Sequence, residues 1–200
     1  MKKFILITLA VATVATFTVS TQSCKKSSTA TVAPTLYDTL GGLVTGTTKA
    51  GEGAALVNDP ANPGTQIEAG KLAIRGVVDS AIFIIAADTI NSFFTVLLTE
   101  LGAHNTSGLT ALEGNLTNFF SYGTGAPQTG SSAVLYTGLS MSNAHNPNVN
   151  TRISHVVNAN AYTSFTNDVV LAAQKNGVPN NIIGSLGKII VSLQPSIVNQ

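Results

Sequence analysis

The histidine with the most informative surroundings is His145, which follows Met141 by four residues in a segment that begins with Tyr136 and Gly138. Residues four apart lie about one turn apart on the same face of a helix. A neutral imidazole presented in this way can bind a metal ion through one ring nitrogen while a hydrogen bond orients the other nitrogen. His145 is therefore the candidate metal ligand of this chain.

The chain has only two other histidines, His104 and His155. His155 lies in an Ile-Ser-His-Val segment, where we expect an exposed side chain or one satisfied by a neighbour. His104 lies in a Gly-Ala-His-Asn-Thr segment and stays open as a second ligand of the same metal. No Gly-x-Ser-x-Gly, P-loop, His-Glu-x-x-His or Cys-x-x-Cys motif is present. Whether the chain is an enzyme is left open by these patterns.

The N-terminal residues have the pattern of an export signal. Two lysines precede an apolar run over residues 4–19. This run is shorter than the roughly 20 residues that a permanent membrane helix needs. We therefore expect residues 1–23 to be a signal peptide that is removed from the mature protein.

The lone cysteine, Cys24, follows small residues at the end of this signal, as in bacterial lipoproteins. Thr21 stands where such signals usually carry leucine. A lone cysteine is more often a buried thiol, but this position favours lipidation and anchoring to a bacterial membrane, on its periplasmic or cell-surface face. We expect residues 24–34 to form the lipidated cysteine and a flexible tether rich in Ser, Thr and Ala.

The composition is that of a weakly charged domain. Only 10% of the residues are charged, and removal of the signal peptide would leave eight basic and nine acidic side chains. A protein that binds nucleic acid through phosphate contacts usually carries a basic patch, which this sequence lacks. Nucleic acid is therefore not an expected partner.

Residues 35–200 read as one all-α domain of five or six helices. Residues 43–66 are dense in Gly, Pro and Asn and predict a long loop or insertion. Residues 67–87 have a helical apolar period, although the β-branched run at 81–87 leaves a strand as the alternative. Leu109, Leu112, Leu116, Phe119 and Phe120 form the next helical stripe, which glycines follow.

Two further helices are predicted towards the C-terminus. Tyr162, Phe165, Val169 and Ala173 share one helical face, which ends at Asn176-Gly177. Pro179 fits the first turn of the last helix, whose apolar face runs from Ile182 to Ile197. Strand patterns are few in the whole sequence.

Five motifs, in this order, resemble the truncated hemoglobins, which are short bacterial globins. They are LYDTLGG at 36–42, the segment from VVD at 77–79 to INSFF at 90–94, FFSYGTGA at 119–126, YxGxxMxxAH at 136–145, and NGVP at 176–179. Each motif is weak alone, but together they cover most of residues 36–198. The resemblance implies a two-over-two helical sandwich that binds heme, with an insertion at about 43–66.

The resemblance also implies roles for individual residues. His145 would be the axial ligand of the heme iron, and Arg152 would pair with a heme propionate. Apolar walls would come from the following side chains: Met141, Phe93, Phe94, Leu112, Leu116, Phe119, Phe165, Ile183, Leu186 and Ile190. A heme site of this kind needs one strong axial nitrogen and an apolar slot.

The sequence also departs from the family. The segments before residue 77 and between residues 94 and 119 are longer than is usual. The tyrosine that commonly donates to a bound gas is replaced in the region Ala81-Ile82-Phe83, and only Asn115 could donate from the distal helix. We therefore expect a secreted heme lipoprotein for sensing a small diatomic ligand, redox chemistry or heme holding, with poor oxygen storage. The alternative is a heme-free globin fold that serves as a structural or interaction module at the cell surface.

Overall fold

The computed structural model describes residues 32–129 and 133–199, so the expected signal peptide, Cys24 and the tether as far as residue 31 lie outside the described residues. The described part is mostly helical, as the sequence predicts, with seven α-helices and one two-stranded sheet. The elements are α1 (Leu36–Thr45), η1 (Glu52–Ala54), β1 (Leu56–Asn58), β2 (Gln66–Glu68), α2 (Ala69–Ala87), η2 (Thr89–Phe94), α3 (Thr95–Gly102), α4 (Ser107–Thr124), α5 (Met141–Ala144), α6 (Ala159–Lys175) and α7 (Asn180–Ile197).

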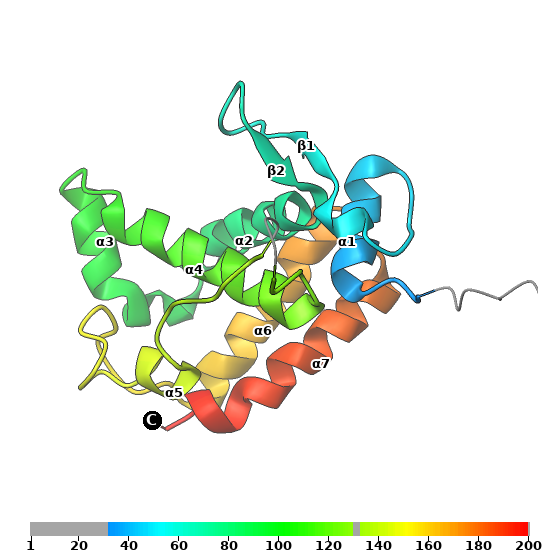
Figure 1. Ribbon diagram of the computed structural model, residues 1–200. Coiled ribbons are helices and arrows are strands. Elements are labelled where there is room, and N and C mark those ends of the chain that lie inside the picture. The colour runs from blue at the N-terminus through cyan, green and yellow to red at the C-terminus, as the bar shows by residue number, and fades with distance from the viewer. Residues whose placement is uncertain (1–31, 130–132, 200) are drawn as a thin grey trace, which may run out of the picture. The chain divides into compact units, whose positions relative to one another are not determined.

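The central element is α2, which packs against α1, α4 and α6, while α6 also packs against α7 (Figure 1). Its inward face carries Ile74, Val77, Val78, Ala81 and Ile85, all buried in one hydrophobic core. Residues at these three- and four-residue steps lie along one side of a helix. The helical prediction for 67–87 is therefore confirmed, and the strand alternative for 81–87 is wrong.

The first helix begins with a capping box. Thr35 accepts a hydrogen bond from the backbone N–H of Asp38, and the Asp38 carboxylate accepts one from the N–H of Thr35. Asp38 also accepts from the N–H of Gly53, at 3.0 Å. Since capping satisfies backbone donors that a helix end leaves free, this one carboxylate both starts α1 and attaches η1 to it.

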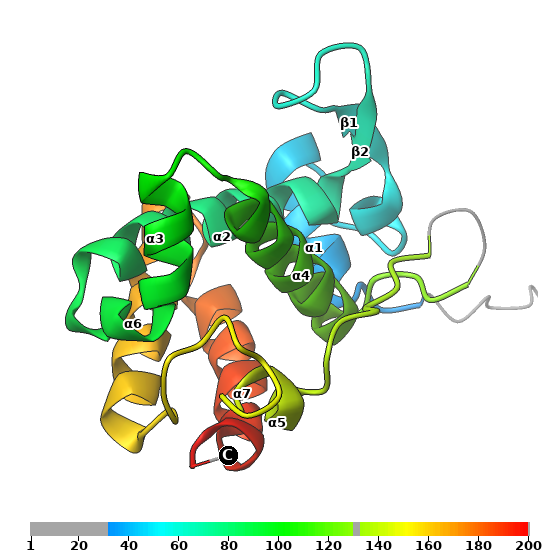
Figure 2. The same ribbon diagram turned by 90° about the vertical axis from the view of Figure 1, so that its left-hand side faces the viewer.

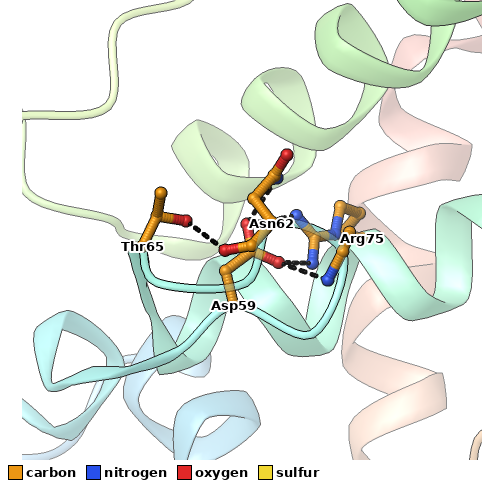
Figure 3. Close-up of polar contacts among 5 residues, drawn as sticks. Asp59, Asn62, Thr65 and Arg75 are labelled. Atoms are coloured by element: carbon orange, nitrogen blue, oxygen red, sulfur yellow. Dashed lines mark hydrogen bonds and ion pairs between the residues drawn. The ribbon is translucent and has the colours of Figure 1, made fainter.

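The segment 43–66 is not the plain loop that its composition predicts. It contains η1 and β1, and β1 pairs antiparallel with β2 in the register Val57↔Ile67. The turn between the strands is organised by Asp59, which accepts hydrogen bonds from the Ala61 N–H and the Asn62 amide and pairs with Arg75 of α2 (Figure 3). Strands of three residues are too short to show an alternating pattern, so no strand is predicted here from the sequence.

Helix boundaries differ from the predictions by a few residues. Ile67 belongs to β2, so α2 starts at Ala69. The stripe helix α4 continues through Gly123 and ends at Gly125, whose φ of 96° suits glycine. Pro179 is the residue before α7 and not part of its first turn. The described residues contain seven α-helices where the sequence predicts five or six, because the apolar stretch after Phe94 forms a separate short helix at 95–102.

In the part of the chain that the structure describes, no single helix combines the length and apolar composition that a membrane crossing requires. One pair, Ala69–Ala87 with Ser92–Gly102, reaches them together across a bend of 99°.

Candidate functional site

A cavity of about 490 Å³ lies within the helical domain. Its wall is contributed by η2, α2 to α7 and the segment between α5 and α6. Most of the lining side chains are aliphatic or aromatic. Ligand pockets in proteins typically enclose about 300–1,000 Å³ and are largely apolar with a few placed polar groups. The cavity therefore has the size and character of a binding site for an organic ligand.

His145 is the polar group placed most specifically in this wall. Its Nδ1 lies 2.8 Å from the carbonyl oxygen of Met141, one turn earlier, so Nδ1 carries the proton and donates. The opposite ring nitrogen, Nε2, makes no hydrogen bond to any described residue and keeps its lone pair. Burial lowers the pKa of His145, and the bond to Met141 opposes that shift only in part. The imidazole is thus held neutral, in the tautomer that can bind a metal through Nε2.

The local fold around His145 is short and tightly capped. The helix α5 is a single turn, and Ser140 caps its start by accepting from the N–H of Asn143. His145 is the residue that ends the helix, and the amide of Asn150 donates to the carbonyl of Ala144 at 2.8 Å. Asn146 precedes Pro147, a position that disfavours helical backbone, and α5 ends before it, as a helix shorter than a typical one.

Ten of the twelve residues that the resemblance assigns to the heme site line this one cavity, among them Phe93, Phe94, Leu112, Leu116, Phe119, Met141, His145 and Arg152. Phe165 and Ile190, named as further apolar wall, line it as well. Ile183 and Leu186 do not: both are buried in the hydrophobic core, where Leu186 lies near Leu40 and Val78. Their assignment to the cavity wall was wrong, because α7 turns that part of its apolar face towards the core.

The wall that α2 contributes is entirely apolar. Ile82, Ile85 and Ala86 line the cavity, while Phe83 points away and is 79% exposed. On α4, Asn115 lies between Leu112 and Leu116 in the lining. Asn115 is thus the polar side chain on this stretch of wall, as the sequence predicted.

Arg152 lies at an open part of the wall. Its side chain is 49% exposed, and its Nη1 is 3.4 Å from Oε2 of Glu100 on α3. Gly108, at the start of α4, lies directly beneath this pair, because a Cβ added there would collide with both charged groups. An exposed pair of this length adds little stability, so Arg152 is available to another anion.

The other histidines are outside the lining. His104 is exposed at the turn between α3 and α4, where its φ is 60°, so the structure does not bring it to His145. His155 is exposed, as expected, but its ring stacks on Phe93 with the centroids 4.0 Å apart. Ser154 next to it donates to the carbonyl of Ser92, at 2.7 Å. These contacts attach the segment between α5 and α6 to η2, on the side of the domain where α3 lies (Figure 2).

Sequence reasoning missed several wall residues. Tyr136 packs edge-on against Phe119, and its hydroxyl donates to the carbonyl of Leu139 at 2.7 Å. The chain between Tyr136 and Leu139 therefore turns back on the ring. Gly138 permits this turn, because a Cβ there would collide with the Tyr136 ring. The Tyr-x-Gly spacing belongs to the motif at 136–145, but that motif does not predict a place for Tyr136 in the wall. Asn150 and the leucines of α3 carry no motif and could be found only from the fold.

Within the described residues, no group of three or more His, Cys, Asp or Glu side chains could hold a metal ion. No model of a protein family matches the chain, and a search of curated proteins finds no match.

Proposed function

We propose that this domain binds heme, with His145 as the axial ligand, on a helical fold of the truncated-hemoglobin type. The observation that carries the proposal is the hydrogen bond from His145 Nδ1 to the Met141 carbonyl, which leaves Nε2 as the free nitrogen of a ring in the cavity wall. A heme iron takes four bonds from the porphyrin and needs one further strong ligand. A single half-buried imidazole with a free Nε2 suits this requirement.

The remaining wall also fits such a ligand. Phe93, Phe94 and Phe119 offer flat apolar surface, and Met141 lies one turn before the imidazole. Arg152 at the exposed part of the wall can pair with a propionate. When bound, heme would supply an iron ion that takes a small diatomic ligand or changes oxidation state. The apolar wall of α2 favours sensing, electron transfer or heme holding over oxygen storage, because a retained oxygen molecule needs a placed donor.

Titration of the purified protein with hemin tests this proposal. We expect a saturable Soret band that is lost in His145→Ala. The matched control is His104→Ala, which removes an exposed histidine outside the cavity and should leave the spectrum unchanged. Equal spectra for wild type and His145→Ala would overturn the proposal.

One observation favours the second candidate, a heme-free module of the same fold. Arg152 is the only lysine or arginine in the lining among the described residues, and it is already paired with Glu100. Heme carries two propionates, so one of them would depend on solvent. If hemin binds no better to the wild type than to His145→Ala, this second function becomes the better account.

We also propose that the mature protein is anchored to a bacterial membrane through a lipid on Cys24, which rests on the sequence alone. Growth with a labelled fatty acid should label the wild-type protein and not Cys24→Ala. Labelling of both proteins would contradict the assignment of the modified residue.

A further inference from the structure

The open part of the cavity wall around Arg152 is aliphatic. Three leucines of α3, Leu97, Leu98 and Leu101, line the cavity here, together with Leu109 and Leu112 of α4. No side chain of this group can coordinate a metal or form a hydrogen bond. The group forms an aliphatic surface, without the aromatic side chains found at η2.

Arg152 is positioned directly beside these leucines. Its guanidinium pairs with Glu100, which lies on α3 between Leu98 and Leu101. A Cβ added to Gly108 would collide with Arg152 and would lie 3.0 Å from Cδ1 of Leu97, so the guanidinium and Leu97 face the same point of the α4 backbone. An exposed cation and a leucine-lined slot therefore adjoin each other at the cavity mouth.

We propose that this open part of the cavity binds a long-chain fatty acid. The carboxylate of the fatty acid would pair with Arg152 and displace Glu100, and its alkyl chain would lie along the leucines of α3 and α4. Arginine binds a carboxylate through two parallel hydrogen bonds, which a surface pair at 3.4 Å does not achieve. Transfer of an alkyl chain from water to an apolar wall lowers the free energy of the complex.

The charge count favours a ligand with one carboxylate. Arg152 is the only side chain with a formal charge in the lining when His145 is neutral, within the residues that the structure describes. A neutral hydrocarbon could not pair with Arg152, so Arg152 would stay paired with Glu100 and would not contribute to the affinity. The inference goes beyond heme binding, since it uses neither His145 nor a metal.

Binding of the fluorescent fatty acid cis-parinaric acid to the heme-free protein, with displacement by palmitate, tests the proposal. We expect saturable binding that weakens roughly tenfold or more in Arg152→Gln, because a hydrogen bond to a charged group is lost. Glu100→Gln should bind up to about fivefold more tightly, since it removes a competitor from a surface pair. Lys188→Gln, a change of an exposed cation outside the lining, is the matched control and should bind like the wild type.

Two comparisons separate this proposal from heme binding. In His145→Ala, which loses heme, binding of cis-parinaric acid should stay saturable and should still weaken on the further change Arg152→Gln. The methyl ester of the probe should bind much more weakly than the acid. The proposal is overturned if the acid shows no saturable binding, if the ester binds as tightly, or if Arg152→Gln binds the acid like the wild type.

Discussion

Both terminal nitrogens of the Arg75 guanidinium donate to the Asp59 carboxylate: Nη2 lies 2.6 Å from Oδ1 and Nη1 lies 3.0 Å from Oδ2 (Figure 3). Both side chains are largely buried. Arg75 belongs to α2, whereas Asp59 begins the turn between β1 and β2. This pair therefore attaches the hairpin to the central helix, and α2 also provides Ile82, Ile85 and Ala86 to the cavity.

Replacing Arg75 by lysine should destabilise the hairpin although the charge is kept, because lysine cannot make two parallel bonds to one carboxylate. The matched control is Arg152→Lys, the same change at an exposed pair with one contact of 3.4 Å. We expect the thermal midpoint to fall several times more for Arg75→Lys than for Arg152→Lys. Equal shifts would mean that the double contact does not stabilise the fold.

Low pH should weaken the pair between Asp59 and Arg75 that attaches the hairpin to α2. The hydrogen bonds from Arg75, and then from Asn62, hold the pKa of Asp59 well below its ordinary value. A carboxyl group with a lowered pKa contributes stability above its unfolded pKa of about 3.9, and this contribution is lost as the pH falls. The protection factors of the β1 and β2 amides, which compare each exchange rate with the intrinsic rate at the same pH, should therefore fall below about pH 4 in the wild type. Asp59→Asn should exchange rapidly already at pH 7, and protected amides in that variant would contradict the assignment.

Gly70 should tolerate no side chain, because Tyr37 is 1% exposed and lies against it. A Cβ on Gly70 would come 2.7 Å from Cε2 of the Tyr37 ring, and a Cβ on Gly53 would collide with Cδ1 of the same ring. The ring is therefore confined from two sides. Gly70→Ala is expected to cost about 1–3 kcal/mol in the free energy of unfolding, as overpacking usually does.

The matched control for this prediction is Gly114→Ala in α4, where a Cβ would meet nothing within 4 Å. The change there should stabilise the protein by roughly 0.4–1 kcal/mol, since alanine restricts the unfolded chain. Urea denaturation of both variants gives the comparison. A stable Gly70→Ala protein would show that the Tyr37 ring can move.

Asp168→Asn should stabilise the protein at neutral pH. Asp168 of α6 is 5% exposed, and its Oδ2 is buried without a hydrogen-bond partner among the described residues. Burial, and then the nearby charge of Asp88, raise the pKa of Asp168. A raised carboxyl pKa gives stability that is present below about pH 3.9 and is lost as the pH rises through the folded pKa.

The thermal midpoint of Asp168→Asn should therefore exceed that of the wild type by a few degrees at pH 7, and the difference should shrink towards pH 4. For a domain of this size about 1 kcal/mol moves the midpoint by about 2–4 °C. Burial also raises the pKa values of Asp79 and Glu113. The stability of the variant should therefore still depend on pH in part, through these two carboxyl groups. A variant that is less stable than the wild type at pH 7 would refute the assignment.

Heme should raise the stability of the protein if the cavity holds it. A ligand at 100 times its Kd stabilises the folded state by about 2.7 kcal/mol, which corresponds to roughly 5–10 °C for a domain of this size. The shift should be much smaller for His145→Ala. Scanning calorimetry with and without hemin measures the shift of the thermal midpoint. An identical shift in both proteins would show that hemin does not bind through His145.

The sequence by itself determined the local features. The period of apolar residues was enough for α2, α4, α6 and α7, because each helix is defined by neighbours three and four residues apart. The spacing of Met141 and His145 likewise defines the turn whose carbonyl orients the imidazole. These relationships span four residues, so they can be read directly from the chain.

Tertiary structure alone decided which apolar faces enclose the cavity and which fill the core. Ile183 and Leu186 share a stripe with Ile190, yet only Ile190 lines the cavity, because α7 crosses from one environment to the other. The same holds for the attachment of Asp59 to Arg75 and of Arg152 to Glu100, which join residues 16 and 52 positions apart. Such contacts depend on how helices pack, and the period of a single segment carries no information about its packing partner.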